Sequence, residues 1–153
     1  MGLDCYIRHG NDHDKAFTQE DDERLKDINL CGGMLSGSGS DGSFRGKVYE
    51  PLIDDLMSMS DEDFNGCGIW HKSEHDNPPY VTSDELKEQA DALADFIQLK
   101  VDIADEDGIV IGDDDIIYSS GDGYNEYTYR EVWDLLTLLR VASERKAVMH
   151  VWW

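Results

Sequence analysis

Positive charge is what this sequence has least of. Its 153 residues include 13 Lys and Arg against 34 Asp and Glu, so the formal net charge at pH 7 is −21. Because phosphate backbones and anionic lipids repel such a surface, this composition argues against direct binding to nucleic acid or to an anionic membrane. It favours a basic protein as partner. The acidity is also uneven, since residues 50–127 contain 22 acidic and 3 basic residues.

Cysteines and long apolar runs are also scarce. The three cysteines, Cys5, Cys31 and Cys67, are odd in number and irregularly spaced, which predicts a reduced chain. No apolar run approaches the ~20 residues that a membrane-spanning helix needs. The first residues lack the basic and apolar regions of a signal peptide. We therefore expect a cytoplasmic protein.

Strong catalytic signatures are absent as well. Residues 37–42 fit GxGxxG, but the strand and helix that a dinucleotide site requires around this motif are not indicated. Residues 41–47 miss the phosphate-loop pattern, because Val48 stands where Ser or Thr is needed. No Ser/His/Asp or Cys/His arrangement can be read from the residue order. We expect a protein that binds rather than catalyses, without a cofactor.

Three capping boxes indicate where helices begin. In each, a Thr precedes an acidic residue by three positions, so that the Thr hydroxyl can accept a hydrogen bond from the acidic residue's backbone N–H, while the carboxylate accepts one from the N-cap N–H. The pairs are Thr18 with Asp21, Thr82 with Glu85, and Thr128 with Glu131.

Hydrophobic spacing completes the predicted fold. Alternation over residues 2–8 indicates a strand, residues 147–153 a last strand, and residues 109–111 with 116–118 a hairpin. Residues 47–59 could form a further helix. The two principal helices carry apolar stripes at helical spacing. These stripes are Leu86, Ala90, Leu93, Ile97 and Val101, and then Val132, Trp133, Leu136 and Leu139. The sequence predicts one α+β domain over residues 1–153, with a small, mostly antiparallel sheet.

The least acidic segment is rich in glycine and serine. The composition of residues 32–46 predicts a flexible loop. Arg45, near its end, and Lys47, just after it, make this part of the chain slightly basic within an acidic sequence. Backbone N–H groups of glycines, a guanidinium and a helix N-terminus can together hold an anion. Aromatic side chains crowd residues 118–129, where stacking could hold a ligand. The candidate ligand-binding residues are Ser43, Arg45, Lys47, Tyr118, Ser120 and Tyr127.

A second candidate site is an acidic stripe. Asp84, Glu88, Asp91 and Asp95 follow helical spacing opposite the apolar stripe of the same predicted helix. Such a face could imitate the charge of DNA and bind a basic protein. The alternative interpretation is a solvated surface without a partner.

A third candidate is a metal site. Cys67, His71 and His75 are spaced by four residues, and residues 71–75 fit HxxEH, with Glu74 as the acid. Nearby glycines and prolines argue against the helix that this pattern needs. Loop histidines are the competing interpretation, so metal is not expected.

The chain opens MetGlyLeuAspCysTyr, and three short segments follow in order at residues 44–47, 80–86 and 118–129. In this opening and these segments the sequence resembles a group of small acidic phage and prophage proteins that open MetGlyLeuAspMetTyr. The group has no known activity. The resemblance implies a phage setting, hence the host cytoplasm, and directs attention to Arg45 and the tyrosines.

Three functions follow as hypotheses. The first is a non-enzymatic phage accessory protein that sequesters a phosphate-bearing small ligand, such as a nucleotide signal of host defence. The second is an acidic DNA mimic that inhibits a basic nucleic-acid-binding protein of the host. The third is a metal-dependent hydrolase that uses His71, Glu74 and His75. In a terminal strand, one of Trp152 and Trp153 would face the core and the other would face outward. The outward-facing one is a candidate contact for a homo-oligomer.

Overall fold

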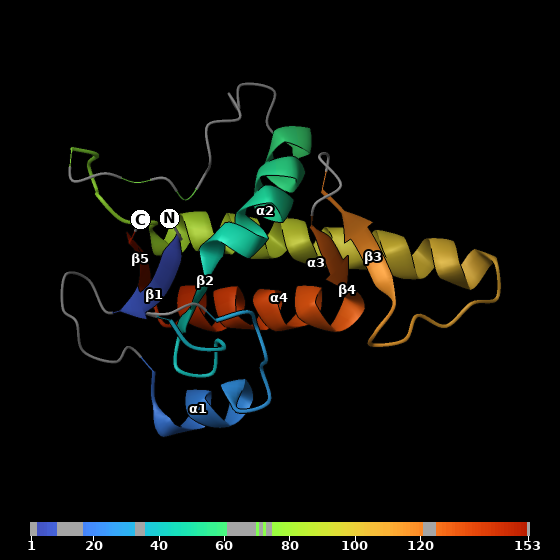
Figure 1. Ribbon diagram of the computed structural model, residues 1–153, viewed down its shortest axis with the longest axis horizontal. Coiled ribbons are helices and arrows are strands. Elements are labelled where there is room, and N and C mark those ends of the chain that lie inside the picture. The colour runs from blue at the N-terminus through green and yellow to red at the C-terminus, as the bar shows by residue number, and fades with distance from the viewer. Residues whose placement is uncertain are drawn as a thin grey trace.

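The computed structural model describes residues 3–8, 17–32, 36–60, 70, 72, 75–120 and 125–152. Within these ranges the chain forms four helices and five strands (Figure 1). The helices are α1 (Gln19–Leu25), α2 (Gly46–Ser60), α3 (Ser83–Glu106) and α4 (Tyr129–Glu144). The strands are β1 (Asp4–Arg8), β2 (Ser43–Arg45), β3 (Ile116–Ser119), β4 (Glu126–Thr128) and β5 (Val148–Trp152). This mixture of helices and small antiparallel sheets in one domain confirms the α+β prediction.

The larger sheet joins the beginning and the end of the described chain. Its order is β2-β1-β5, and β1 is antiparallel to both neighbours. Cys5 lies opposite Phe44 on one side and Val151 on the other. Strands β3 and β4 form a separate antiparallel pair. The first and last strands therefore lie side by side, at the left of Figure 1.

All three predicted capping boxes are formed. Thr82 accepts a hydrogen bond from the backbone N–H of Glu85 at 3.2 Å, and the Glu85 carboxylate accepts one from the N–H of Thr82. Thr18 and Thr128 cap α1 and α4 in the same way. Each such cap stabilises its helix by about 1 kcal/mol. The start of these three helices is thus determined locally.

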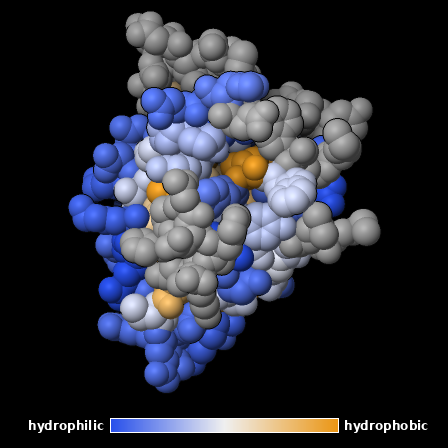
Figure 2. All heavy atoms as spheres, turned by 90° about the vertical axis from the view of Figure 1, so that its left-hand side faces the viewer, coloured by the Kyte–Doolittle hydropathy of each residue, from blue (hydrophilic) through white to orange (hydrophobic). Residues whose placement is uncertain are grey.

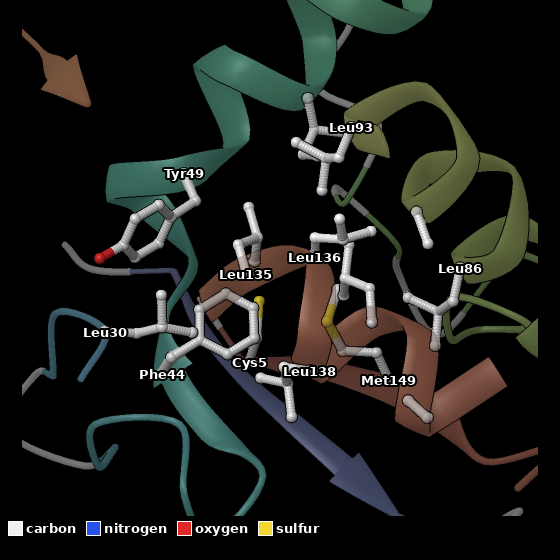
Figure 3. Close-up of a cluster of buried hydrophobic side chains, with 14 of the residues drawn as sticks. Cys5, Leu30, Phe44, Tyr49, Leu86, Leu93, Leu135, Leu136, Leu138 and Met149 are labelled. Carbon is white, nitrogen blue, oxygen red and sulfur yellow. The ribbon is translucent and has the colours of Figure 1, made fainter. Parts of the chain in front are cut away.

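The core lies between α3, α4 and the inner face of the larger sheet. Helix α4 contributes a run of fully buried leucines, and α3 contributes its predicted apolar stripe (Figure 3). Cys5, Phe44 and Met149 project from the sheet into the same cluster. Period-2 alternation in β1 explains this, because Cys5 and Ile7 are buried while Tyr6 and Arg8 are partly exposed.

Tyr49 links three parts of the chain inside this core. Its hydroxyl accepts a hydrogen bond from the backbone N–H of Cys31 at 2.8 Å and donates one to Glu131 Oε2 at 3.1 Å. Burial, together with the nearby Glu131 carboxylate, raises the pKa of Tyr49. The hydroxyl therefore stays protonated and holds α2, the 29–32 segment and the start of α4 together.

Three sequence predictions differ from the structure. Residues 109–111 form no strand, and the hairpin is instead β3–β4. Residues 32–46 are not one loop, because Ser43–Arg45 pairs with β1 as β2 and Gly46 begins α2. Trp133 is 38% exposed rather than buried, and its ring packs edge-on against Tyr129. The pairings of β2 with β1 and of β3 with β4 join residues that are distant in the sequence, and local spacing does not specify them.

Apolar exposure is concentrated at one end of the molecule. The last turns of α3 and the chain that follows project beyond α4 and the β3–β4 pair, at the right of Figure 1. Five of the seven exposed large apolar side chains of the described residues lie in residues 99–116. The opposite end, where the larger sheet lies, shows a mostly hydrophilic described surface with small apolar areas (Figure 2). No helix among the described residues is long and apolar enough to cross a bilayer.

Candidate functional site

The two cations of the predicted ligand site lie at the junction of β2 and α2. Arg45 ends β2 and is partly exposed, while Lys47 is exposed in the first turn of α2. Arg45 lies opposite Asp4 in the sheet register, and Asp4 is nearly buried and accepts a hydrogen bond from Ser36 at 2.8 Å. With the described residues, the side chains of Arg45 and Lys47 form no hydrogen bond or ion pair. They remain available to an anion.

Ser43, by contrast, is part of a closed turn. Its hydroxyl donates to Asp41 Oδ1 at 2.8 Å and accepts from the backbone N–H of Gly37 at 2.8 Å, and the residue is 3% exposed. Gly39 and Gly42 turn the chain here with φ values of 99° and 88°. Ser43 therefore fixes the approach to β2 and has no free group for a ligand.

The tyrosines of the predicted ligand site belong to the core. Tyr127 is fully buried, and its hydroxyl donates to the carbonyl of Val48 at 2.6 Å. Tyr118 donates to Asp55 at 2.6 Å, and burial together with this hydrogen bond raises the pKa of Tyr118 to about 12. Their rings stack at 6.3 Å between centroids. Both hydroxyls thus anchor the β3–β4 pair to α2.

Ser120 closes the turn between β3 and β4. Its backbone N–H donates to the carbonyl of Asn125, and its hydroxyl accepts from the N–H of Asn125 at 3.2 Å. The residue is 6% exposed. The structure therefore does not bring the six predicted ligand residues together as one open site, because four of them are held in structural contacts.

The acidic residues of α3 are placed as the sequence predicts. Asp84, Glu88, Asp91 and Asp95 are all exposed, whereas the apolar stripe faces the core. Asp91 accepts a hydrogen bond from Lys87 at 3.0 Å, and the other three form no ion pair with the described residues. Asp102 and Glu106 are also exposed and continue the same helical spacing. We call these six residues the acidic stripe.

A shallow hollow of ≈ 320 Å³ borders the acidic stripe where α3 packs on α4. Both charge signs line it, since Lys87 and Asp91 come from α3 and Arg140 and Glu144 from α4. The mixed charge does not select an anion. This is not the site that the sequence predicts, because none of Arg45, Lys47 or the tyrosines lines it.

The predicted metal site falls largely outside the described residues. Cys67, His71 and Glu74 lie there, and His75 is exposed. The part of the chain that is described contains no group of three or more His, Cys, Asp or Glu side chains placed to hold a metal ion.

Sequence reasoning missed the apolar side chains beside the acidic stripe. Leu99 and Ile103 lie four residues apart on α3 and are 55% and 48% exposed. The available signal was their position outside the core stripe of the same helix. Of the two terminal tryptophans, Trp152 is 67% exposed, as expected of an outward-facing residue, and Trp153 lies outside the described residues.

Comparisons with known proteins add no relative. No family model matches the chain, and neither any curated protein nor any solved structure is significantly similar to it.

Proposed function

We propose that this chain is a non-enzymatic binding protein whose acidic stripe engages a basic surface of another protein. The observation that carries the proposal is the exposure of all four predicted acids along one face of α3. Helix α3 contains eight acidic and two basic residues. A face with this excess attracts Lys- and Arg-rich surfaces and speeds their association.

The dimensions of the acidic stripe support mimicry of nucleic acid. With a rise of about 1.5 Å per residue, the carboxylates from Asp84 to Glu106 extend over about 33 Å. This is close to one turn of B-DNA, which is about 34 Å long. Along the axis the carboxylates are about 6.6 Å apart on average, with the widest gap of about 10.5 Å between Asp95 and Asp102, against about 3.4 Å for phosphates of one strand. The stripe thus offers about half the charge density of one strand, along a rigid rod.

We favour the acidic stripe over the phosphate-ligand site because more of its polar groups are exposed to solvent. The stripe keeps its carboxylates in solvent, whereas Ser43, Tyr118, Ser120 and Tyr127 use their polar groups in structural contacts. A host nuclease or another DNA-binding protein fits the phage setting that the sequence suggests. Inhibition would need no turnover and no cofactor.

Neutralising the stripe should weaken competition with DNA. The stripe-neutral variant carries Asp84→Asn, Glu88→Gln, Asp91→Asn and Asp95→Asn. In a panel of basic DNA-binding proteins loaded with a fluorescent duplex, the native chain should displace the duplex from at least one member. The stripe-neutral variant should need about tenfold more protein, a change of about 1.4 kcal/mol. Fluorescence anisotropy at several salt concentrations measures this, and the native affinity should fall steeply with salt.

The matched control removes the same number of charges elsewhere. Its substitutions lie at exposed acids of α1, the following turn and β4: Glu20→Gln, Glu23→Gln, Asp27→Asn and Glu126→Gln. The control should retain most of the competition. If both variants lose it equally, net charge alone acts and the acidic stripe is not the site. If the native chain displaces no duplex, the mimicry proposal is wrong.

A second candidate function retains the phosphate-bearing ligand at Arg45 and Lys47. The observation in its favour is that these two cations form no ion pair with the described residues in a chain of net charge −21. A nucleotide at 100 times its Kd should stabilise the fold by about 2.7 kcal/mol. For a chain of this length we expect Tm to rise by about 5–10 °C.

Differential scanning fluorimetry with a nucleotide panel tests this second function. Arg45→Ala should abolish the increase in Tm. Lys26→Ala removes an exposed cation whose one ion pair among the described residues is with Glu23, and this variant should leave the increase intact. Absence of an increase with every nucleotide, or an increase that survives Arg45→Ala, would remove Arg45 from the ligand hypothesis.

A further inference from the structure

An apolar strip lies at the C-terminal end of the acidic stripe. Leu99 and Ile103 are 55% and 48% exposed, Ile109 is 55% exposed and Val110 is 90% exposed. Large apolar side chains exposed together mark interaction surfaces more often than isolated ones do. We call residues 99–116 the α3 tip.

Backbone geometry holds these apolar side chains together. Leu99 and Ile103 are four residues apart on one helix and so lie on one face. Helix α3 ends in a Schellman turn, in which Gly108 has φ 70° and the N–H of Ile109 donates to the carbonyl of Ala104 at 2.8 Å. This hydrogen bond places the backbone of Ile109 beside the last turn of the helix. The strip is therefore an ordered feature of the helix end.

The α3 tip is rich in exposed carboxylates and poor in cations. The α3 tip contains seven acidic residues and one basic residue, and all seven acids are exposed. The acids are Asp102, Asp105, Glu106, Asp107, Asp113, Asp114 and Asp115. Lys100, the one base, lies over the ring of Phe96 at 5.5 Å. Arg130 of α4 lies 3.8 Å from one of these acids, Asp113, but its closer partner is Asp134 of α4, at 3.2 Å. The α3 tip as a whole therefore carries a formal charge of −6.

We propose that the α3 tip binds a cationic amphipathic segment of the partner protein, with Leu or similar side chains on the apolar strip and Lys or Arg toward the carboxylates. This inference rests on the proposed function, because the tip continues the acidic stripe, and it specifies what the partner must carry. A purely basic groove would leave the strip in water. A second copy of this chain would place one tip of formal charge −6 against another of the same charge. Charge complementarity therefore selects a basic occupant. The projection of α3 beyond the rest of the fold leaves room for that segment (Figure 1).

Two synthetic peptides of equal charge test the inference. Both are 18 residues long, with Lys on one helical face, and they differ in having either Leu or Gln on the other face. Isothermal titration calorimetry should show the Leu peptide binding the native chain about tenfold more tightly than the Gln peptide, as burial of about 55 Å² of apolar surface would give at 25 cal/mol per Å². The variant Leu99→Gln/Ile103→Gln should remove this difference, while Trp152→Gln, an exposed apolar residue outside the tip, should preserve it.

The outcomes separate this inference from the proposed function. Equal affinity of the two peptides, or a Leu preference that survives Leu99→Gln/Ile103→Gln, overturns the inference. If the affinity of both peptides is nevertheless lower for the stripe-neutral variant than for the native chain, the proposed function stands and only the inference about the α3 tip fails. If neither peptide binds the native chain, both proposals fail. Because the substituted side chains are exposed, Tm of each variant should match the native value, and this is checked first.

Discussion

Replacing Gly46 by Ala should lower the free energy of unfolding by about 3 kcal/mol, the upper end of the usual cost of overpacking a core. Gly46 is the first residue of α2 and lies against the central strand β1. A Cβ at this position would overlap Sγ of Cys5, which is fully buried, and would also approach the carbonyl of Leu3 at 3.3 Å. Since β1 is hydrogen-bonded on both sides, it cannot move away without disturbing the whole sheet.

A double-mutant cycle with Cys5→Ala makes this prediction specific. Cys5→Ala removes the sulfur that the new methyl group would overlap, so the double variant should be more stable than Gly46→Ala alone. Urea unfolding followed by circular dichroism measures the coupling between the two sites. Gly112→Ala is the control, because a Cβ there makes only an ordinary contact with Asp115. Equal losses at Gly46 and Gly112, or no coupling with Cys5, would contradict the steric explanation.

Replacing Arg145 by Ala should cost about 3 kcal/mol. Asp21, in α1, is fully buried, and both of its carboxylate oxygens accept hydrogen bonds from the Arg145 guanidinium, at 2.5 and 3.0 Å. Breaking a buried ion pair from one side leaves an unpaired buried charge and costs about 3–5 kcal/mol. We expect the lower end, because Arg145 itself is partly exposed. Arg24→Ala, which breaks the exposed pair with Glu144 at 2.8 Å, should cost less than 1 kcal/mol.

The pH dependence of stability distinguishes this pair from simple loss of packing. Burial tends to raise the pKa of Asp21, but the hydrogen bonds from Arg145 and Thr18 outweigh it, and the pKa lies below its ordinary value of 3.8. A carboxylate with a lowered pKa in the folded state contributes its full stabilisation above the unfolded-state pKa. This contribution is lost as the pH falls through the folded-state pKa. The free energies of unfolding of the native chain and Arg145→Ala should therefore converge as the pH falls below 3.8 and through the lowered pKa of Asp21. A gap that stays constant from pH 7 to pH 2 would mean that packing, not charge, carries the effect.

Local signals explain how much of the fold could be read from the sequence. The capping boxes at Thr18, Thr82 and Thr128 each involve residues three positions apart, so they specify helix starts without any tertiary contact. The apolar stripe of α3 could also be predicted from residue spacing, because a long amphipathic helix has one face for the core and one for solvent. For the same reason the exposure of the acidic residues on α3 was predictable.

Long-range contacts explain what could not be read. Tyr127 bonds to Val48 and Tyr118 to Asp55, 79 and 63 residues away, and nothing in the tyrosine segment itself indicates these partners. Residues 109–111 have the composition of a strand, but none of the strands that the structure describes pairs with them. The Schellman turn at the end of α3 leaves Ile109 exposed instead. Aromatic and β-branched residues thus show where packing or pairing is possible, while the tertiary structure decides whether it occurs.

The position of β1 in the centre of its sheet has a consequence for how the protein is synthesised. β2 follows β1 early in the chain, but the partner on its other edge begins only at Val148. A nascent chain therefore carries β1 with one open row of N–H and C=O groups until residues 148–152 have been synthesised. Open strand edges recruit strands of other molecules. Ribosome-bound intermediates that lack β5 should be the species most prone to aggregate. Once β5 pairs with β1, the open edge of β1 becomes the interior of the sheet.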